Sequence, residues 1–145
     1  MTIRPAIPQD VQEWLRMRSI LWPDHQGHSK DTNSYFEGNS KQVITLVAEN
    51  QRNQLVGFAE VGSRDYAEGC TSSPVAYLEG WYVDEKVRRS GIGLELVQAA
   101  EKWAREQGFS ELASDCRLDN PISAQAHESC GFSETDRMIC FKKQL

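Results

Sequence analysis

The chain lacks an apolar run long enough to cross a membrane, and its first residues lack a charged and then apolar leader. A membrane-spanning helix needs about 20 consecutive apolar residues. Met1 to Arg4 instead lead directly into strand-like sequence, which does not resemble a secretory signal. Both absences favour a cytoplasmic protein.

No Cys-x-x-Cys pair occurs, because the cysteines are widely scattered. Closely spaced cysteines would indicate a zinc ribbon or a disulfide framework. His25 and His28 also have no carboxylate or cysteine at a spacing typical of metal ligands. We therefore expect no metal site, and reduced thiols at Cys70, Cys116, Cys130 and Cys140.

Basic residues are in the minority, with 16 Lys and Arg against 21 Asp and Glu, so the net charge is −5. This balance argues against nucleic acid or an anionic membrane as the main partner. It would suit a polycationic small molecule. The length of 145 residues, without repeats or linkers, predicts a single domain over residues 1–145.

Hydrophobic periodicity predicts an α+β fold with three consecutive strands in the middle, which excludes a simple alternating parallel sheet. A first strand is expected at 2–7, and a helix from 8–10 that Trp22-Pro23 ends. A polar, mobile loop (24–40) with a short helix at 34–37 follows. The remaining elements are strands at 43–48, 55–61 and 74–83, a helix at 91–107, a strand at 111–116, a helix at 120–130 and a closing strand at 137–143.

A basic, glycine-broken turn connects the third middle strand to the helix that follows it, and its sequence is Arg88-Arg89-Ser90-Gly91-Ile92-Gly93. Glycines let the backbone approach an anion closely. Unpaired N–H groups of the first helical turn, the helix dipole and the arginines all favour a pyrophosphate. Taken alone the pattern is weak, since such turns also serve packing.

This turn, and the later helix that opens at Asn120 and ends before Gly131-Phe132, together resemble the GNAT superfamily of acetyl-CoA-dependent N-acetyltransferases. The resemblance extends over the whole chain. It implies a mixed, mostly antiparallel, twisted sheet flanked by helices on both faces.

A narrower likeness is to the aminoglycoside 6′-N-acetyltransferase branch, carried by segments such as Trp22-Pro23-Asp24-His25, Leu78-Glu79-Gly80 and Ala113-Ser114-Asp115. That branch implies a cytoplasmic antibiotic-resistance enzyme, commonly a homodimer. Such an enzyme transfers acetyl from acetyl-CoA to the 6′-amino group of an aminoglycoside, by direct attack in a ternary complex.

The resemblance also implies the residues that bind acetyl-CoA. The backbone of the glycine turn would hold the pyrophosphate. An N–H group of the preceding strand would polarise the thioester carbonyl, and Asn120 would contact the cofactor besides capping its helix. The set is Trp81, Tyr82, Val83, Arg89, Ser90, Gly91, Ile92, Gly93, Leu94 and Asn120.

Two carboxylates are the candidate catalytic groups. Asp115 would be the base or proton relay, with Glu79 as the alternative. Strand alternation places Glu79 on one face with Tyr77 and Trp81, and Gly80 indicates a β-bulge. A rim carboxylate with a surface partner is the other interpretation of Glu79.

Substrate contacts are expected from aromatic, histidine and acidic side chains. They are Trp22, His25, Tyr66, Glu79, Asp115 and Asp136. His127 stands where many superfamily members carry a tyrosine that protonates the departing thiolate, and it could equally be a packed helix histidine.

Two further functions are consistent with the sequence. One is acetylation of a polyamine, an amino sugar or a protein amine. The other is a non-catalytic protein that binds acyl-CoA or a drug, which the missing tyrosine suggests.

Overall fold

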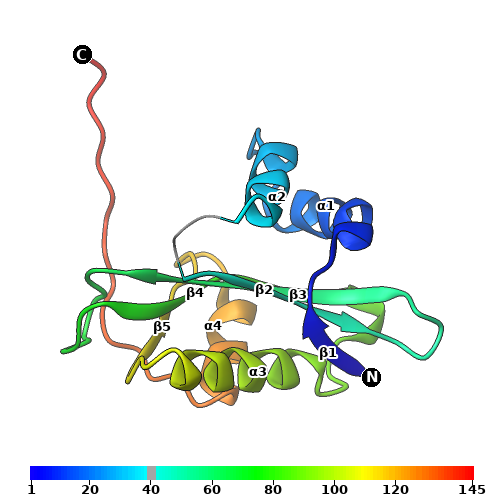
Figure 1. The fold of residues 1–145 in the computed structure, drawn as a ribbon. Coiled ribbons are helices and arrows are strands. Elements are labelled where there is room, and N and C mark those ends of the chain that lie inside the picture. Colours follow the sequence, from blue (N-terminus) through cyan, green and yellow to red (C-terminus); the bar gives the residue numbers. More distant parts are fainter. Residues whose placement is uncertain (39–41) are drawn as a thin grey trace.

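The computed structural model describes residues 1–38 and 42–145 (Figure 1). Its centre is a five-stranded sheet with the order β1-β2-β3-β4-β5. Only β4 and β5 are parallel, and all other neighbours are antiparallel. The strands are β1 (Thr2–Pro5), β2 (Ile44–Glu49), β3 (Leu55–Arg64), β4 (Val75–Val83) and β5 (Leu112–Ser114). The expected mixed, mostly antiparallel sheet is confirmed.

Helices cover both faces of the sheet, as expected (Figure 1). One face carries α1 (Val11–Leu21) and α2 (His28–Phe36), and the other carries α3 (Ile92–Glu106) and α4 (Pro121–Ser129). Short 3-10 turns, η1 (Pro8–Asp10) and η2 (Glu85–Val87), precede α1 and α3. Within the described ranges, no helix is long and apolar enough to span a membrane.

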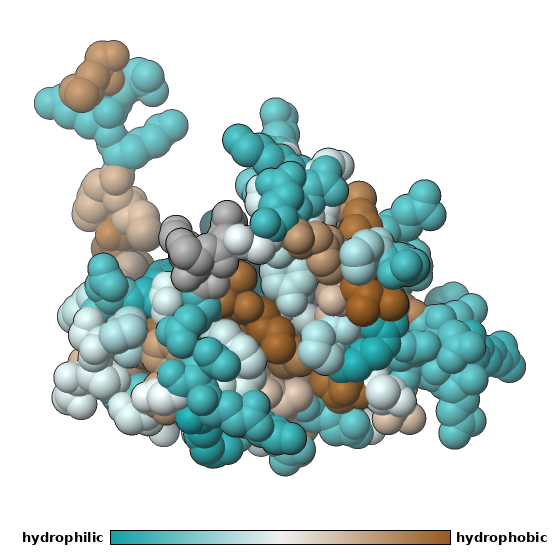
Figure 2. All heavy atoms as spheres, in the orientation of Figure 1, coloured by the Kyte–Doolittle hydropathy of each residue, from teal (hydrophilic) through white to brown (hydrophobic). Residues whose placement is uncertain are grey.

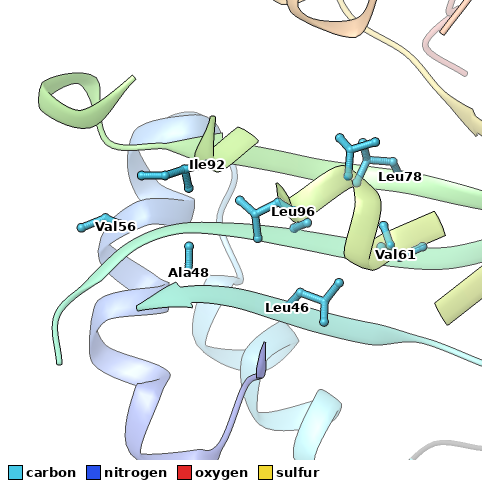
Figure 3. Close-up of a cluster of buried hydrophobic side chains, with 10 residues drawn as sticks. Leu46, Ala48, Val56, Val61, Leu78, Ile92 and Leu96 are labelled. Carbon is cyan, nitrogen blue, oxygen red and sulfur yellow. The ribbon is translucent and has the colours of Figure 1, made fainter. Parts of the chain in front are cut away.

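The larger core lies between the sheet and α3, whose apolar residues recur at helical spacing. Leu96 and Val97 are fully buried there (Figure 3). Opposite them lie residues of β2, β3 and β4, namely Leu46, Ala48, Val56, Ala59, Val61 and Leu78.

A second core joins α1 to the opposite face of the sheet. Trp14 and Met17 on α1 pack with Val47, Phe58 and Tyr82 from three strands. This core holds α1 over the middle of the sheet and so fixes where the loop after α1 begins.

The short helix expected at 34–37 is wrong in extent, because α2 already begins at His28. Thr32 is fully buried, and the edges of Tyr35 and Phe36 meet Trp14 at centroid distances of 5.5 and 6.0 Å. Tertiary packing therefore stabilises a helix that its polar sequence does not predict. Residues 39 and 40 of the expected mobile loop lie outside the described residues.

The closing strand expected at 137–143 is wrong. That segment pairs with no strand in the part of the chain that the structure describes. It stands clear of the body, with Ile139 and Phe141 78% and 90% exposed (Figure 2). A high β propensity makes a strand only where a neighbouring strand accepts its backbone groups.

We expect Leu96→Ala to lower the free energy of unfolding by about 2–5 kcal/mol, because the truncated side chain leaves a cavity in a fully packed site. Denaturant unfolding followed by circular dichroism measures the change. Leu94→Ala is the matched control, since Leu94 is 41% exposed on the same helix. Equal losses for both variants would contradict the assigned core.

Candidate functional site

A β-bulge in β4 organises the site. Glu60 pairs with Gly80 and the next residue of β3, Val61, pairs with Leu78, so Glu79 is the extra residue. The bulge that Gly80 indicated is confirmed. It shifts the side-chain alternation by one residue.

The bulge separates two residues that were expected to share a face. Glu79 lines a cavity on the α1 face of the sheet, together with Trp14. Trp81 instead packs on the α3 face, where its Nε1 donates to the carbonyl oxygen of Gly93 at 3.1 Å. The expectation that Glu79 and Trp81 lie together is therefore wrong, because simple alternation does not hold across a bulge.

Gly80 has a steric role as well. The indole of Trp22, the residue that ends α1, lies directly on its backbone. A Cβ atom at position 80 would stand 2.5 Å from Cη2 of Trp22. Glycine is thus required for the close approach of the α1 end to β4.

The two candidate catalytic carboxylates are connected through an arginine and a tyrosine. Arg64 donates to both carboxylate oxygens of Glu79, at 2.8 and 2.7 Å. Its guanidinium lies 3.6 Å from the ring centroid of Tyr77, and the Tyr77 hydroxyl donates to Asp115. The chain of contacts spans β3, β4 and the end of β5.

Tyr77 donates the hydrogen bond to Asp115 in this series of contacts. Burial, and then the hydrogen bond to Asp115, raise the pKa of the Tyr77 phenol well above its usual range. The phenol therefore keeps its proton at neutral pH and donates it in the hydrogen bond to Asp115. Tyr77 thereby fixes the orientation of Asp115 directly after β5.

Two cavities adjoin these groups. The Trp22 cavity, of about 490 Å³, is lined by Trp22, His25 and Arg117 among others. The Glu79 cavity, of about 180 Å³, lies over the middle of the sheet. Arg18 and Asp31 line both. Trp22, His25 and Glu79 are therefore brought to one region. Asp115 is joined to Glu79 through Tyr77 and Arg64.

Tyr66 and Asp136 are not brought to these cavities. Tyr66 is 66% exposed in the loop between β3 and β4 and donates to Glu68 at 3.1 Å. Asp136 lies on the C-terminal tail, near enough for its charge to help raise the pKa of Tyr66, to which Glu68 contributes most. Tyr66 and Asp136 therefore lie near each other, apart from the two cavities.

The glycine turn has the geometry of an anion site. Arg89 and Gly91 adopt left-handed backbone conformations, with φ values of 63° and 89°. The first helical hydrogen bond joins the N–H of Glu95 to the carbonyl of Gly91 at 3.0 Å. The N–H groups of Ile92, Gly93 and Leu94 therefore have no partner within the helix and are available to a ligand.

The Asn120 side chain caps α4, accepting from the N–H of Ser123 at 3.1 Å. This confirms the helix start, and any cofactor contact would be additional. His127, in the last turn of α4, has Nε2 within 2.8 Å of Ser114 Oγ, and its ring lies 5.0 Å from that of Trp81. It is a packed histidine next to the parallel strand pair.

Sequence reasoning missed three residues of this site. Arg18 and Arg64 acquire their partners through helix packing and strand register, and Tyr77 acquires Asp115 through the β4–β5 pairing. Only the shared strand face of Tyr77 and Glu79 could have indicated one of them.

Comparison with known proteins gives a consistent result. The acetyltransferase (GNAT) family matches residues 12–132. The aminoglycoside N(6′)-acetyltransferase type 1 of Klebsiella aerogenes is 43% identical over 146 residues, which cover 99% of this chain and 96% of that protein. The protein of the same name from Stenotrophomonas maltophilia is 40% identical, with coverage of 99% and 94%.

Solved structures agree. The apo aminoglycoside 6′-N-acetyltransferase AAC(6′)-IG of Acinetobacter haemolyticus superimposes with a TM-score of 0.89 at 35% identity, covering 100% of this chain and 99% of that one. AAC(6′)-Iy, in complex with the bisubstrate analog CoA-S-monomethyl-acetylneamine, has a TM-score of 0.91 at 32% identity, with coverage of 99% and 98%.

We expect Gly80→Ala to destabilise the protein by about 1–3 kcal/mol, because the new methyl group overlaps the Trp22 indole. Denaturant unfolding gives the free energy, and tryptophan emission reports the displaced ring. Gly62→Ala on β3 is the matched control, since its Cβ would meet only Val43, at an ordinary 3.6 Å. Two equally stable variants with unchanged emission would contradict the contact.

Proposed function

The chain belongs to the acetyltransferase (GNAT) family, and we propose that it transfers the acetyl group of acetyl-CoA to the 6′-amine of aminoglycoside antibiotics. The observation that carries this proposal is the full-length similarity to aminoglycoside N(6′)-acetyltransferases. The linked carboxylates support it, since Glu79 in the Glu79 cavity and Asp115, joined to it through Tyr77 and Arg64, suit a polycationic substrate. Acetylation of the drug would confer resistance.

The glycine turn suits the diphosphate of coenzyme A. Its N–H groups are unpaired by the helix and converge at the positive end of the helix dipole. Residues 89–94 would bind the phosphates, and the backbone of Trp81, Tyr82 and Val83 and the side chain of Asn120 would contact the rest. Acetyl-CoA supplies an acetyl thioester, whose carbonyl the drug amine attacks to give an amide and a free thiol.

Asp115 would receive the proton of the drug ammonium. Tyr77 holds one carboxylate oxygen, which fixes the group and leaves the other oxygen to the substrate or to a water molecule. Transfer of that proton gives the neutral amine that can attack directly, with both substrates bound together.

Glu79 would bind an ammonium group of the same drug. Its partner Arg64 is 45% exposed and Glu79 itself 39% exposed. An ion pair that is this exposed to water contributes about 0–1 kcal/mol to the free energy of folding. A substrate cation can therefore replace Arg64 at little cost. Glu79 is therefore a rim carboxylate with a surface partner, and it would be the alternative acid–base group. Trp22 and His25 would hold the sugar rings.

We also propose that the protein is a cytoplasmic homodimer. The four cysteines are free thiols, which suits a reducing compartment. The tail presents four large apolar side chains, Met138, Ile139, Phe141 and Leu145, that are 56–108% exposed. A second copy that covers the tail would remove them from water. Tyr66 and Asp136, at the base of the tail, would then meet the drug in the dimer.

Release of free thiol from acetyl-CoA tests the function directly. We expect turnover with kanamycin A, tobramycin and neomycin B, and none with paromomycin, which differs from neomycin B only by a hydroxyl at the 6′ position. Turnover with spermidine or a peptide above every aminoglycoside would favour the broader amine acetyltransferase. Binding of drug and acetyl-CoA without thiol release would favour a non-catalytic protein.

We expect Asp115→Asn to lower kcat by more than about tenfold, with the KM for acetyl-CoA within about twofold, because only proton transfer from the drug is impaired. Steady-state kinetics with kanamycin A measures both constants. Asp119→Asn, an exposed aspartate paired with Arg117 in the same loop, is the control and should retain full activity. Unchanged turnover in Asp115→Asn would remove Asp115 from the chemistry.

We expect sedimentation velocity to give a dimer for the full chain and a monomer after deletion of residues 138–145, because the deletion removes the exposed apolar side chains. The double variant Lys142→Ala, Lys143→Ala keeps those side chains and should remain dimeric. Identical sedimentation of the full and shortened chains would refute a tail-mediated dimer.

A further inference from the structure

Arg18, on the inner side of α1, is a buried cation that the proposed chemistry does not use. Only 7% of its surface is exposed. Its Nε and Nη2 donate to the two carboxylate oxygens of Glu60 on β3, at 2.6 and 3.2 Å. The Trp14 indole N–H also donates to Glu60, at 2.9 Å. A buried charge with this many partners is held in one orientation.

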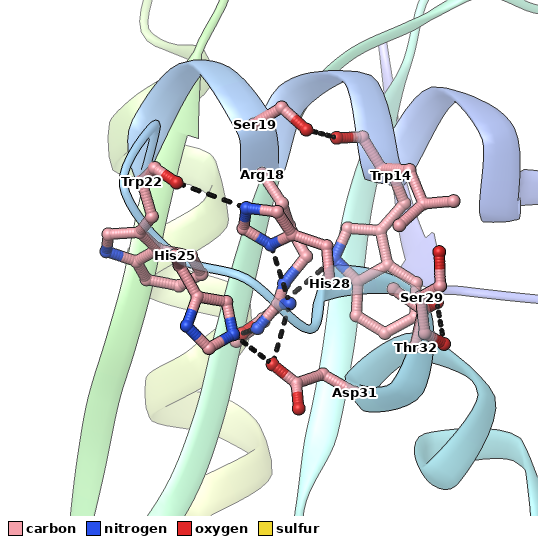
Figure 4. Close-up of polar contacts among 11 residues, drawn as sticks. Trp14, Arg18, Ser19, Trp22, His25, His28, Ser29, Asp31 and Thr32 are labelled. Carbon is pink, nitrogen blue, oxygen red and sulfur yellow. Dashed lines mark hydrogen bonds and ion pairs between the residues drawn. The ribbon is translucent and has the colours of Figure 1, made fainter.

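The remaining guanidinium nitrogen, Nη1, is directed at the segment that follows α1. It lies 3.1 Å from Oδ2 of Asp31 and 3.0 Å from Nδ1 of His28 (Figure 4). His25 Nε2 meets the same Asp31 oxygen at 2.8 Å. Arg18 thus ties the segment from 22 to 31 to the sheet through Glu60.

The hydrogen-bond roles of the two ring nitrogens of His28 follow from their partners. A guanidinium can only donate, so Nδ1 of His28 must accept, and the ring proton lies on Nε2. That Nε2 is 3.1 Å from the carbonyl oxygen of Trp22, to which it donates (Figure 4). The hydrogen bonds therefore run in one direction, from Arg18 through His28 to the backbone of Trp22.

Arg18 contacts the Trp22 side chain as well. Its Cζ atom lies 4.9 Å from the centroid of the indole ring. Atoms Cη2 and Cζ2 of that ring lie against Gly80, beside Glu79. Trp22 is consequently held by Arg18, by His28 and by the bulged strand, at the position where it lines the Trp22 cavity.

We propose that Arg18 is a positioning residue for the aminoglycoside, which it does not contact as a catalytic group. It holds Trp22 and Asp31 in the walls of the cavities, so that the drug meets a preformed surface. The proposal rests on the proposed function. The positioning effect is geometric, because one planar guanidinium contacts Glu60, Asp31, His28 and the Trp22 indole at the same time.

Arg18→Lys is the informative variant, because lysine keeps the positive charge near Glu60 but lacks the planar fork. We expect its Kd for kanamycin A, measured by titration calorimetry, to rise by about tenfold. The Kd for acetyl-CoA should stay within about twofold, since Arg18 lies on the α1 face of the sheet and the glycine turn opens α3 on the opposite face (Figure 1). A merely structural role would not weaken one ligand selectively.

The position of Trp22 gives a second readout that needs no ligand. The indole N–H signal of Trp22, assigned by its loss in Trp22→Phe, should shift or broaden in Arg18→Lys in a ¹H–¹⁵N spectrum. The signal of Trp103, on the opposite face of the sheet, should not move. Arg4→Lys is the matched control, since Arg4 is also held by two carboxylates, those of Asp10 and Glu49, and should change neither signal nor Kd.

His28→Ala keeps the Arg18–Glu60 pair, and it is the second variant to test if Arg18→Lys does not fold. It should weaken kanamycin A binding by about threefold and move the Trp22 signal. The proposal is overturned if the Trp22 signal stays in place, if kanamycin A affinity is unchanged, or if the wild type does not bind kanamycin A. Binding by the wild type without acetyl transfer would instead overturn the proposed function and leave the Arg18 assignment standing.

Discussion

The bulge at Glu79 and Gly80 is the constraint on which the site depends. One extra residue in β4 turns Glu79 toward the α1 face and leaves Trp81 on the α3 face, beside the glycine turn. The indole of Trp22 rests on the backbone of Gly80, within the same bulge. A local irregularity of one strand thus connects the proposed drug-binding region to the proposed cofactor-binding region.

Burial separates the acidic residues that stabilise the fold from those available to a ligand. The Arg18–Glu60 pair is enclosed, with side-chain exposures of 8% and 16%, whereas Arg64 and Glu79 are 45% and 39% exposed. Breaking an enclosed pair leaves a buried charge without a partner, which is energetically costly. The Arg18–Glu60 pair is therefore suited to hold the residues that line the cavities in place. An open pair is weak, so its carboxylate can exchange an arginine for a substrate ammonium.

Local signals in the sequence predicted the structure of the proposed cofactor-binding region but not that of the proposed drug-binding region. The glycine turn, α3 and the Asn120 cap are short-range features, and their positions are confirmed. The partners of Arg18 and Arg64 depend on long-range packing and strand register, which no periodicity reveals. The prediction of a strand at 137–143 was wrong for a related reason. Its sequence suits a strand, but no strand in the described part of the chain pairs with it.

A crystal structure of the protein with coenzyme A and kanamycin A tests the account most directly. The account predicts the diphosphate on the N–H groups of residues 89–94, and the 6′-amine between Asp115 and Glu79, with the drug against Trp22. A diphosphate bound elsewhere, or a drug that presents no amine to either carboxylate, would contradict it.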